Sequence, residues 1–89
     1  MKIPNDGNDP ATIALRALVW ICSEPQRADR FLAITGVEAD DLRARLMDPA
    51  LHQAVIAFLA NHEADLLACA EALDLPPSAL VDVAAEAYP

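Results

Sequence analysis

The sequence predicts an all-α protein, a compact bundle of five to six short helices. Apolar residues make up 55% of the chain but aromatic residues only 4%, so alanine, leucine, isoleucine and valine form the core. Alanine is the best helix former and is depleted in sheets, and the chain has only two glycines. Apolar residues also recur at the spacing of a helical face, and several such segments begin with a capping residue and an early proline.

The first helix is predicted to begin after Asp9, which can cap it, with Pro10 in the first helical position. It should run to about Ser23. Its sequence, ATIALRALVWIC, is apolar on almost every face, and Thr12 and Arg16 form a single polar strip one turn apart. A helix of this kind is surrounded by other helices, so we expect it at the centre of the bundle.

Ser23 is expected to cap the second helix, with Pro25 early in that helix. Gly36 stands where a left-handed residue would end the helix. Its core-facing stripe comprises Ala28, Phe31, Leu32 and Thr35. A short third helix is predicted around Asp40–Met47, and its inward residues are Leu42 and Leu46.

Asp48 and Pro49 repeat the combination of cap and proline and predict the start of a fourth helix. Its inward stripe comprises Leu51, Val55, Phe58 and Leu59. Asn61 is expected to cap a fifth helix, whose core positions are Leu66, Cys69, Ala70 and Leu73. A sixth helix should follow Pro77 and pack through Leu80, Val83, Ala84 and Ala87.

Caps and core positions recur at a spacing of 38 residues, although the identity between the two halves is very low. Gly36-Val37 corresponds to Asp74-Leu75, and Trp20-Ile21-Cys22-Ser23 corresponds to Phe58-Leu59-Ala60-Asn61. This correspondence predicts two packed three-helix units with approximate internal two-fold symmetry. Solenoid repeats need three or more units, so two units favour a closed bundle.

Residues 1–8 are expected to be a disordered leader, and residues 9–89 a single helical domain. The N-terminal segment lacks the charged and apolar regions of a signal peptide, and the longest apolar run, Ile13–Cys22, is too short to span a membrane. We therefore predict a cytoplasmic protein that does not bind a membrane. In that compartment Cys22 and Cys69 should be reduced thiols, although a disulfide between them stays open.

The formal charge of the chain is −8, and all six lysine and arginine residues lie at or before Arg45. Acidic residues of the second half can therefore form ion pairs within the chain only with arginines of the first half. An acidic excess mostly keeps a protein soluble, but it also favours a basic partner.

The segment His62–Leu66 reads HEADL and differs from the metalloprotease motif His-Glu-x-x-His at its last position. Glu63 falls in the first helical turn, where a negative charge interacts favourably with the helix dipole. No close ligand pair of the kind that structural zinc sites use occurs among Cys22, His52, His62 and Cys69. We therefore predict no metal, no cofactor and no catalytic residue, and we expect both thiols to be buried and unreactive.

Several motifs point to one family. The most specific is Arg30-Phe31-Leu32-x-x-x-Gly36, followed by Asp41-Leu42-Arg43 and later by Asp48-Pro49 and Ala54-Val55-Ile56-x-Phe58-Leu59. On these motifs the chain, from about Ala14 to Ala87, resembles a family of short bacterial proteins without known function, catalogued as domain of unknown function 3572. Asn61-His62 departs from the family pattern, in which an acidic residue commonly precedes the glutamate. The resemblance supports the helical fold and implies no chemistry.

We predict a non-enzymatic protein-interaction or adaptor module, because the sequence contains no catalytic constellation and distributes its charge unevenly. Arg30 is expected to pack beside Phe31 and to pair with an acid of another helix, such as Glu63 or Asp65. The candidate interaction residues are Arg27, Arg30, Arg43, Arg45, Glu63 and Asp65. The expected partner is a protein, for which the acidic excess favours a basic one, and a homodimer also stays open.

Two alternative functions stay open. A small-ligand-binding protein or minor enzyme would use a pocket between the two three-helix units, lined by Arg16, Arg30 and His52. A nucleic-acid binder would use the helix-turn-helix-like segment around Gly36, with the cations Arg27, Arg30, Arg43 and Arg45. The acidic residues Glu38, Asp40 and Asp41 in the same segment disfavour contact with a polyanion.

Overall fold

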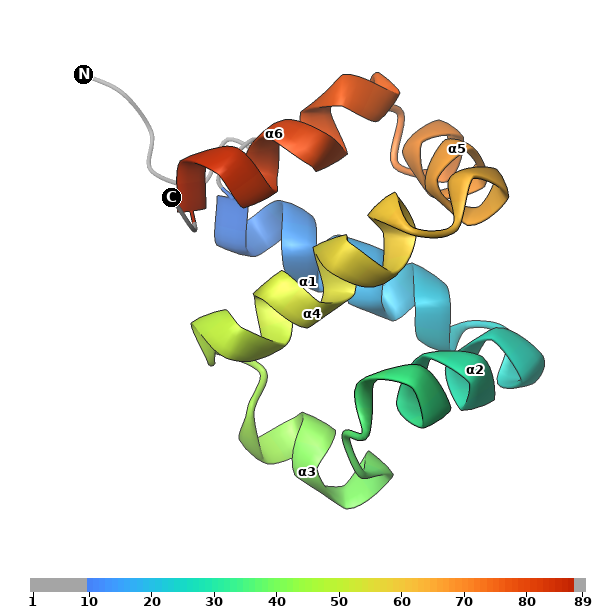
Figure 1. Cartoon of the computed structure of the whole chain (residues 1–89), viewed down its shortest axis with the longest axis vertical. Coiled ribbons are helices and arrows are strands. Elements are labelled where there is room, and N and C mark those ends of the chain that lie inside the picture. Colours follow the sequence, from blue (N-terminus) through green and yellow to red (C-terminus); the bar gives the residue numbers. More distant parts are fainter. Residues whose placement is uncertain (1–9, 88–89) are drawn as a thin grey trace.

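A computed structural model describes the backbone of residues 10–87 and the side chains up to residue 82. This part of the chain forms six helices and no strand, which confirms the predicted all-α bundle (Figure 1). The helices are α1 Pro10–Cys22, α2 Pro25–Thr35, α3 Ala39–Ala44, α4 Pro49–Ala60, α5 Glu63–Ala72 and α6 Pro77–Ala87. The expected leader, the Asp9 cap and the side chains of Val83, Ala84 and Ala87 lie outside the described residues.

Helices α1 and α4 lie side by side in the middle of the molecule, as predicted for α1 (Figure 1). Each of them packs against α2, α5 and α6 as well as against the other. Together they supply most of the buried apolar residues of the core. The four predicted core residues of α4 are all buried: Leu51, Val55, Phe58 and Leu59.

Two of the predicted helix ends are confirmed by their hydrogen bonds. The carboxylate of Asp48 accepts a hydrogen bond from the backbone N–H of Ala50 (2.9 Å), and Pro49 occupies the first helical position of α4. Gly36 ends α2 with φ = 75°, and its N–H donates to the carbonyl of Leu32 (2.9 Å). A residue without a Cβ takes this left-handed conformation at little cost.

The predicted capping roles of Ser23 and Asn61 are wrong. The Ser23 hydroxyl donates to the carbonyl of Trp20 (2.6 Å), and the Asn61 amide donates to the carbonyl of Ala57 (2.9 Å). Both side chains thus donate to carbonyls in the last turn of the preceding helix, which are within reach of a short polar side chain. The N-cap positions of α2 and α5 are Glu24 and His62, and neither makes a capping hydrogen bond through its side chain.

Helix α3 is shorter than predicted and lies at one end of the molecule, away from α6 (Figure 1). Leu42 packs against the core as expected. Leu46 was expected to face inward but is 39% exposed, because the helix ends at Ala44 and the following turn carries this side chain outward. Cys22 was expected to be buried but is exposed, since α1 ends there.

The structure supports the 38-residue repeat at the level of the helix starts. Helices α4, α5 and α6 each begin within one residue of the position that lies 38 residues after the start of α1, α2 and α3. Asp74, which corresponds to Gly36, also has a positive φ of 59°. After it the N–H of Leu75 donates to the carbonyl of Ala70 (2.9 Å), which closes a Schellman turn at the end of α5. The two-fold symmetry in space stays a prediction.

Candidate protein-interaction surface

The outward face of α1 carries an apolar residue in an exposed position. Val19 is 69% exposed, although it belongs to α1, which together with α4 contributes most of the core. It continues the polar strip that starts with Thr12 and Arg16, since positions three and four residues apart share a helix face. The outward face of α1 thus ends in an apolar side chain that the core does not cover.

A first hollow of about 310 Å³ lies between α1 and α3 on one side of Val19. Most of its surface is apolar. Arg43 of α3 and the exposed Cys22 of α1 are the groups in its wall that carry chemistry. The complete lining is Leu18, Val19, Cys22, Ala39, Leu42, Arg43 and Leu46.

A second hollow of about 380 Å³ lies on the other side of Val19, between α1 and the end of α5. Its lining is also largely apolar and comprises Arg16, Val19, Trp20, Ser23, Ala72 and Leu73. The Arg16 guanidinium donates through Nη2 to the carbonyl of Leu73 (2.9 Å). This hydrogen bond satisfies a carbonyl at the end of α5 and places a cation where the helix dipole is negative.

The two hollows flank a single ridge. Successive residues of an α-helix are about 100° apart around the axis. Leu18 and Cys22 therefore lie on one side of Val19, and Trp20 and Ser23 on the other, in agreement with the linings of the two hollows. We call Val19 with its two flanking hollows the α1 ridge surface.

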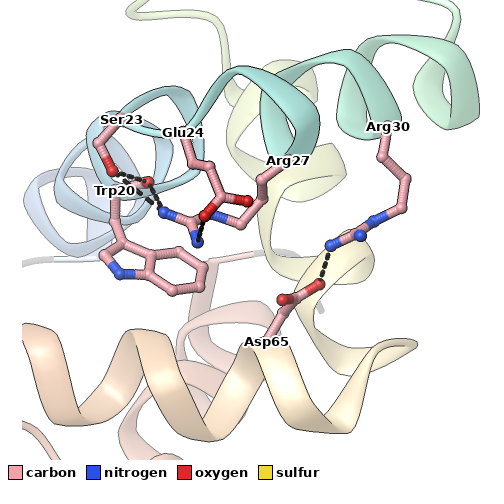
Figure 2. A network of polar contacts seen from close by, with 6 residues as sticks. All are labelled: Trp20, Ser23, Glu24, Arg27, Arg30 and Asp65. Atoms are coloured by element: carbon pink, nitrogen blue, oxygen red, sulfur yellow. Dashed lines mark hydrogen bonds and ion pairs between the residues drawn. The ribbon is translucent and has the colours of Figure 1, made fainter.

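Arg27 holds Trp20, one wall of the second hollow, in place. Its guanidinium carbon lies 3.6 Å from the centroid of the indole ring, and its Nη2 donates to the Trp20 carbonyl (2.7 Å) and to the Ser23 hydroxyl (3.0 Å) (Figure 2). Its Nη1 lies 3.8 Å from a carboxylate oxygen of Glu24. The Arg27 side chain is only 14% exposed, so its contacts are mainly internal.

Arg30 joins α2 to α5, as predicted. Its guanidinium forms an ion pair with Asp65 (Figure 2). It also lies 5.7 Å from the ring centroid of the buried Phe58. Asp65 is therefore the partner, whereas Glu63, the other predicted candidate, is exposed and pairs with none of the described cations. This arginine stabilises the contact between two helices and is not a free binding group.

The remaining two candidate arginines, which flank the end of α3, differ from each other. The Nε of Arg45 donates to Asp48 (3.2 Å). The pKa of Asp48 is lowered, first by the hydrogen bond from Ala50 N–H and then by Arg45. Arg43 is exposed and makes no ion pair or hydrogen bond within the described part of the chain.

Each of the two histidines donates a hydrogen bond to a backbone carbonyl. The Nδ1 of His62 donates to the carbonyl of Phe58 (2.6 Å), and the imidazole stacks on the Phe58 ring at 4.6 Å. His52 is buried and its Nε2 donates to the carbonyl of Leu46 (2.6 Å).

Leu66 packs against the core, so the HEADL segment is a helix start. Among residues 10–82, no three His, Cys, Asp or Glu side chains lie close enough together to hold a metal ion.

The pocket that was predicted between the two three-helix units is not assembled as expected. Arg16, Arg30 and His52 bond to three different partners: the Leu73 carbonyl, Asp65 and the Leu46 carbonyl. Arg16 lines the second hollow, whereas neither Arg30 nor His52 lines the first or the second one.

Both cysteines are free thiols. Burial raises the pKa of the Cys69 thiol to about 11. Partial burial of the otherwise exposed Cys22 also raises the pKa of its thiol. Both thiols are therefore protonated at neutral pH, which is unfavourable for nucleophilic catalysis.

The comparisons with known proteins agree with the family resemblance. Residues 7–88 match a family described as protein of unknown function (DUF3572). No curated protein and no solved structure matches the chain. None of the helices in the described residues is both long enough and apolar enough to cross a membrane.

Proposed function

We propose that the chain, which belongs to the DUF3572 family of proteins of unknown function, is a non-enzymatic protein-interaction module that binds its partner at the α1 ridge surface. The observation that carries this proposal is Val19, which stands 69% exposed between two largely apolar hollows. Removing such a surface from water is favourable in proportion to the apolar area that is covered. A contiguous apolar patch on a small protein commonly marks an interaction site.

The size of the hollows favours side chains of a protein partner over a complete small molecule. Their volumes of about 310 and 380 Å³ lie at the lower end of the range of about 300–1,000 Å³ that is typical of small-ligand pockets. Because they lie on opposite sides of one ridge, a single peptide segment that crosses Val19 can fill both. In contrast, a small molecule would occupy one hollow and leave the ridge exposed.

The experiment that tests this proposal compares two valine variants in affinity capture from cells that naturally contain the protein. Val19→Asp places a charge on the ridge, whereas Val81→Asp places the same charge on α6, where Val81 is 47% exposed and lines neither hollow. We expect the wild type and Val81→Asp to retain a common partner that Val19→Asp loses. Equal recovery by all three proteins would refute the ridge as the binding site. Equal melting temperatures would show that both variants fold.

A second candidate function is the binding of a small anionic ligand in the second hollow. The supporting observation is that Arg16 and Trp20 both line it. A carboxylate attached to an apolar group would suit these two side chains. A rise in melting temperature with one class of metabolite, lost in Arg16→Gln, would favour this candidate over a protein partner.

Nucleic-acid binding receives little support from the arginines. Of the four cations considered for it, Arg27, Arg30 and Arg45 each pair with a carboxylate. A phosphate would have to compete with these carboxylates, and the net charge of −8 opposes the approach of a polyanion. We expect no mobility shift of DNA or RNA at low salt, where electrostatic binding is strongest.

A further inference from the structure

The five arginines of the chain fall into two groups. Arg27, Arg30 and Arg45 each form an ion pair with an acidic residue, and none of the three lines a hollow of the α1 ridge surface. Arg43 lines the first hollow and Arg16 the second. Within the described residues, these two pair with no carboxylate: Arg43 makes no polar contact, and Arg16 bonds to a neutral carbonyl.

This division is unexpected in a protein with so many carboxylates. The chain has 14 acidic residues against six lysines and arginines, so an arginine would be expected to find a carboxylate within the chain. Both hollows nevertheless have an exposed guanidinium in their walls. Acidic residues stand close by in the chain, such as Asp40 and Asp41 before Arg43 and Glu71 before Ala72, but none of them lines a hollow. The charged group in the lining of each hollow is therefore a guanidinium, which favours a carboxylate beside it.

We infer that the segment that docks on the α1 ridge surface is an acidic amphipathic segment of a different protein. This inference rests on the proposed function. The segment places one apolar side chain in each hollow and carboxylates beside Arg16 and Arg43. Carboxylates match the planar N–H fork of a guanidinium, and the apolar side chains cover Val19. The partner at this face thus has the sign of charge opposite to that which the net charge of the chain favours.

A basic segment would bring its cations against two arginines that have no internal carboxylate to offset them. The exposed acidic residues that would suit a basic partner line neither hollow; they are Glu63 and Glu71 of α5, Asp74 after it and Asp82 of α6. The alternative to a different protein is a second copy of this chain. Its α5 also presents an acidic amphipathic segment, because Leu67 is exposed between Glu63 and Glu71 at helical spacing.

The test uses three synthetic helical peptides without tryptophan, which differ only in the residues around two leucines placed two turns apart. The flanking residues are glutamate, glutamine or lysine. Binding is followed by the fluorescence of Trp20, the only tryptophan of the chain, which lines the second hollow. We expect the glutamate peptide to bind about three- to thirtyfold more tightly than the glutamine peptide, as two partly exposed ion pairs would provide. The lysine peptide should bind most weakly.

Four variants complete the experiment. Arg16→Gln and Arg43→Gln should each remove part of the preference for glutamate, whereas Arg30→Gln, an arginine outside the surface, should leave it unchanged. Val19→Asp should weaken binding of all three peptides. Equal binding of the glutamate and glutamine peptides would overturn the acidic partner, while a loss in Val19→Asp would still support the ridge. If no peptide bound, or if Val19→Asp had no effect, the ridge itself would be refuted.

Sedimentation of the protein alone tests whether a second copy of this chain binds at the α1 ridge surface. We expect the same monomeric mass for the wild type and for Arg16→Gln. A dimer that dissociates in Arg16→Gln and Arg43→Gln would identify a second copy as the occupant and would overturn the inference of a different protein.

Discussion

Asp74 adopts a backbone conformation that suits glycine better than aspartate. Its φ of 59° lies in the left-handed region, which costs an L-residue roughly 1–2 kcal/mol, with aspartate and asparagine at the low end. The corresponding residue of the first half is Gly36, with φ = 75°. The same turn geometry therefore uses a favourable residue in one half of the chain and a less favourable one in the other.

Asp74→Gly is expected to stabilise the protein by about 0.5 kcal/mol, because the relieved backbone cost exceeds the added chain entropy of glycine. Gly36→Ala should destabilise it by about 1–2 kcal/mol. No atom lies within 4 Å of a Cβ at position 36, so this loss comes from the backbone and not from a steric clash. Urea unfolding measures both changes. Asp74→Asn separates the loss of charge from the change in backbone, and a less stable Asp74→Gly would contradict the assignment.

Single residues also show what the sequence can and cannot predict. Gly36 and Asp48 were predicted correctly because their roles depend on near neighbours in the chain. Ser23 and Asn61 were assigned to the wrong helix end, since a short polar side chain between two helices can bond to either of them. Asp65 was correctly named as one of two expected partners of Arg30, because few cations are available to the acidic residues of the second half.

At the scale of helices, Asp48 connects the start of α4 with the end of α3. It accepts hydrogen bonds from Ala50 N–H and from Arg45, and both favour its charged form. The pKa of the folded state therefore lies below the ordinary value of 3.8. A lowered carboxyl pKa contributes stability above pH 3.8, and this contribution is lost as the pH falls through the pKa of the folded state.

Asp48→Ala is accordingly expected to lower the melting temperature at neutral pH. The difference between the wild type and the variant should shrink below pH 3.8, where the wild-type carboxylate becomes protonated. Asp48→Asn keeps a capping oxygen but cannot ionise, so it should lose less stability at neutral pH. Melting curves recorded from neutral to acidic pH measure these effects. A difference that is independent of pH would contradict the role of the charge.

The ion pair between α2 and α5 should contribute little energy. The side chains of Arg30 and Asp65 are 45% and 21% exposed, and exposed pairs typically contribute about 0.2–1 kcal/mol. A double-mutant cycle with Arg30→Ala and Asp65→Ala is expected to give a coupling energy in this range. The single variants should also retain the captured partner. Loss of the partner in Arg30→Ala with unchanged stability would show that this arginine binds the partner directly.

At the scale of the whole molecule, the helices were predictable and the surface between them was not. The predicted stripe of α4 identified four of its buried residues and missed His52 and Ile56, which are also buried. The two hollows depend on how α3 and the end of α5 approach α1, which no local pattern encodes. One signal was nevertheless present in the sequence, because Val19 lies on the same helix face as Thr12 and Arg16. An apolar residue on the predicted polar strip is a position that packing in the core does not explain.

The most direct test of the proposed binding surface is amide hydrogen exchange of the protein alone and in complex with its captured partner. We expect the partner to slow exchange in residues 16–23 of α1 and in residues 39–46, which form the ridge and the wall of the first hollow. Exchange in α6 should remain unchanged. Protection that is confined to α5 and α6, with α1 and α3 exchanging as in the free protein, would contradict the claim that the partner binds across Val19.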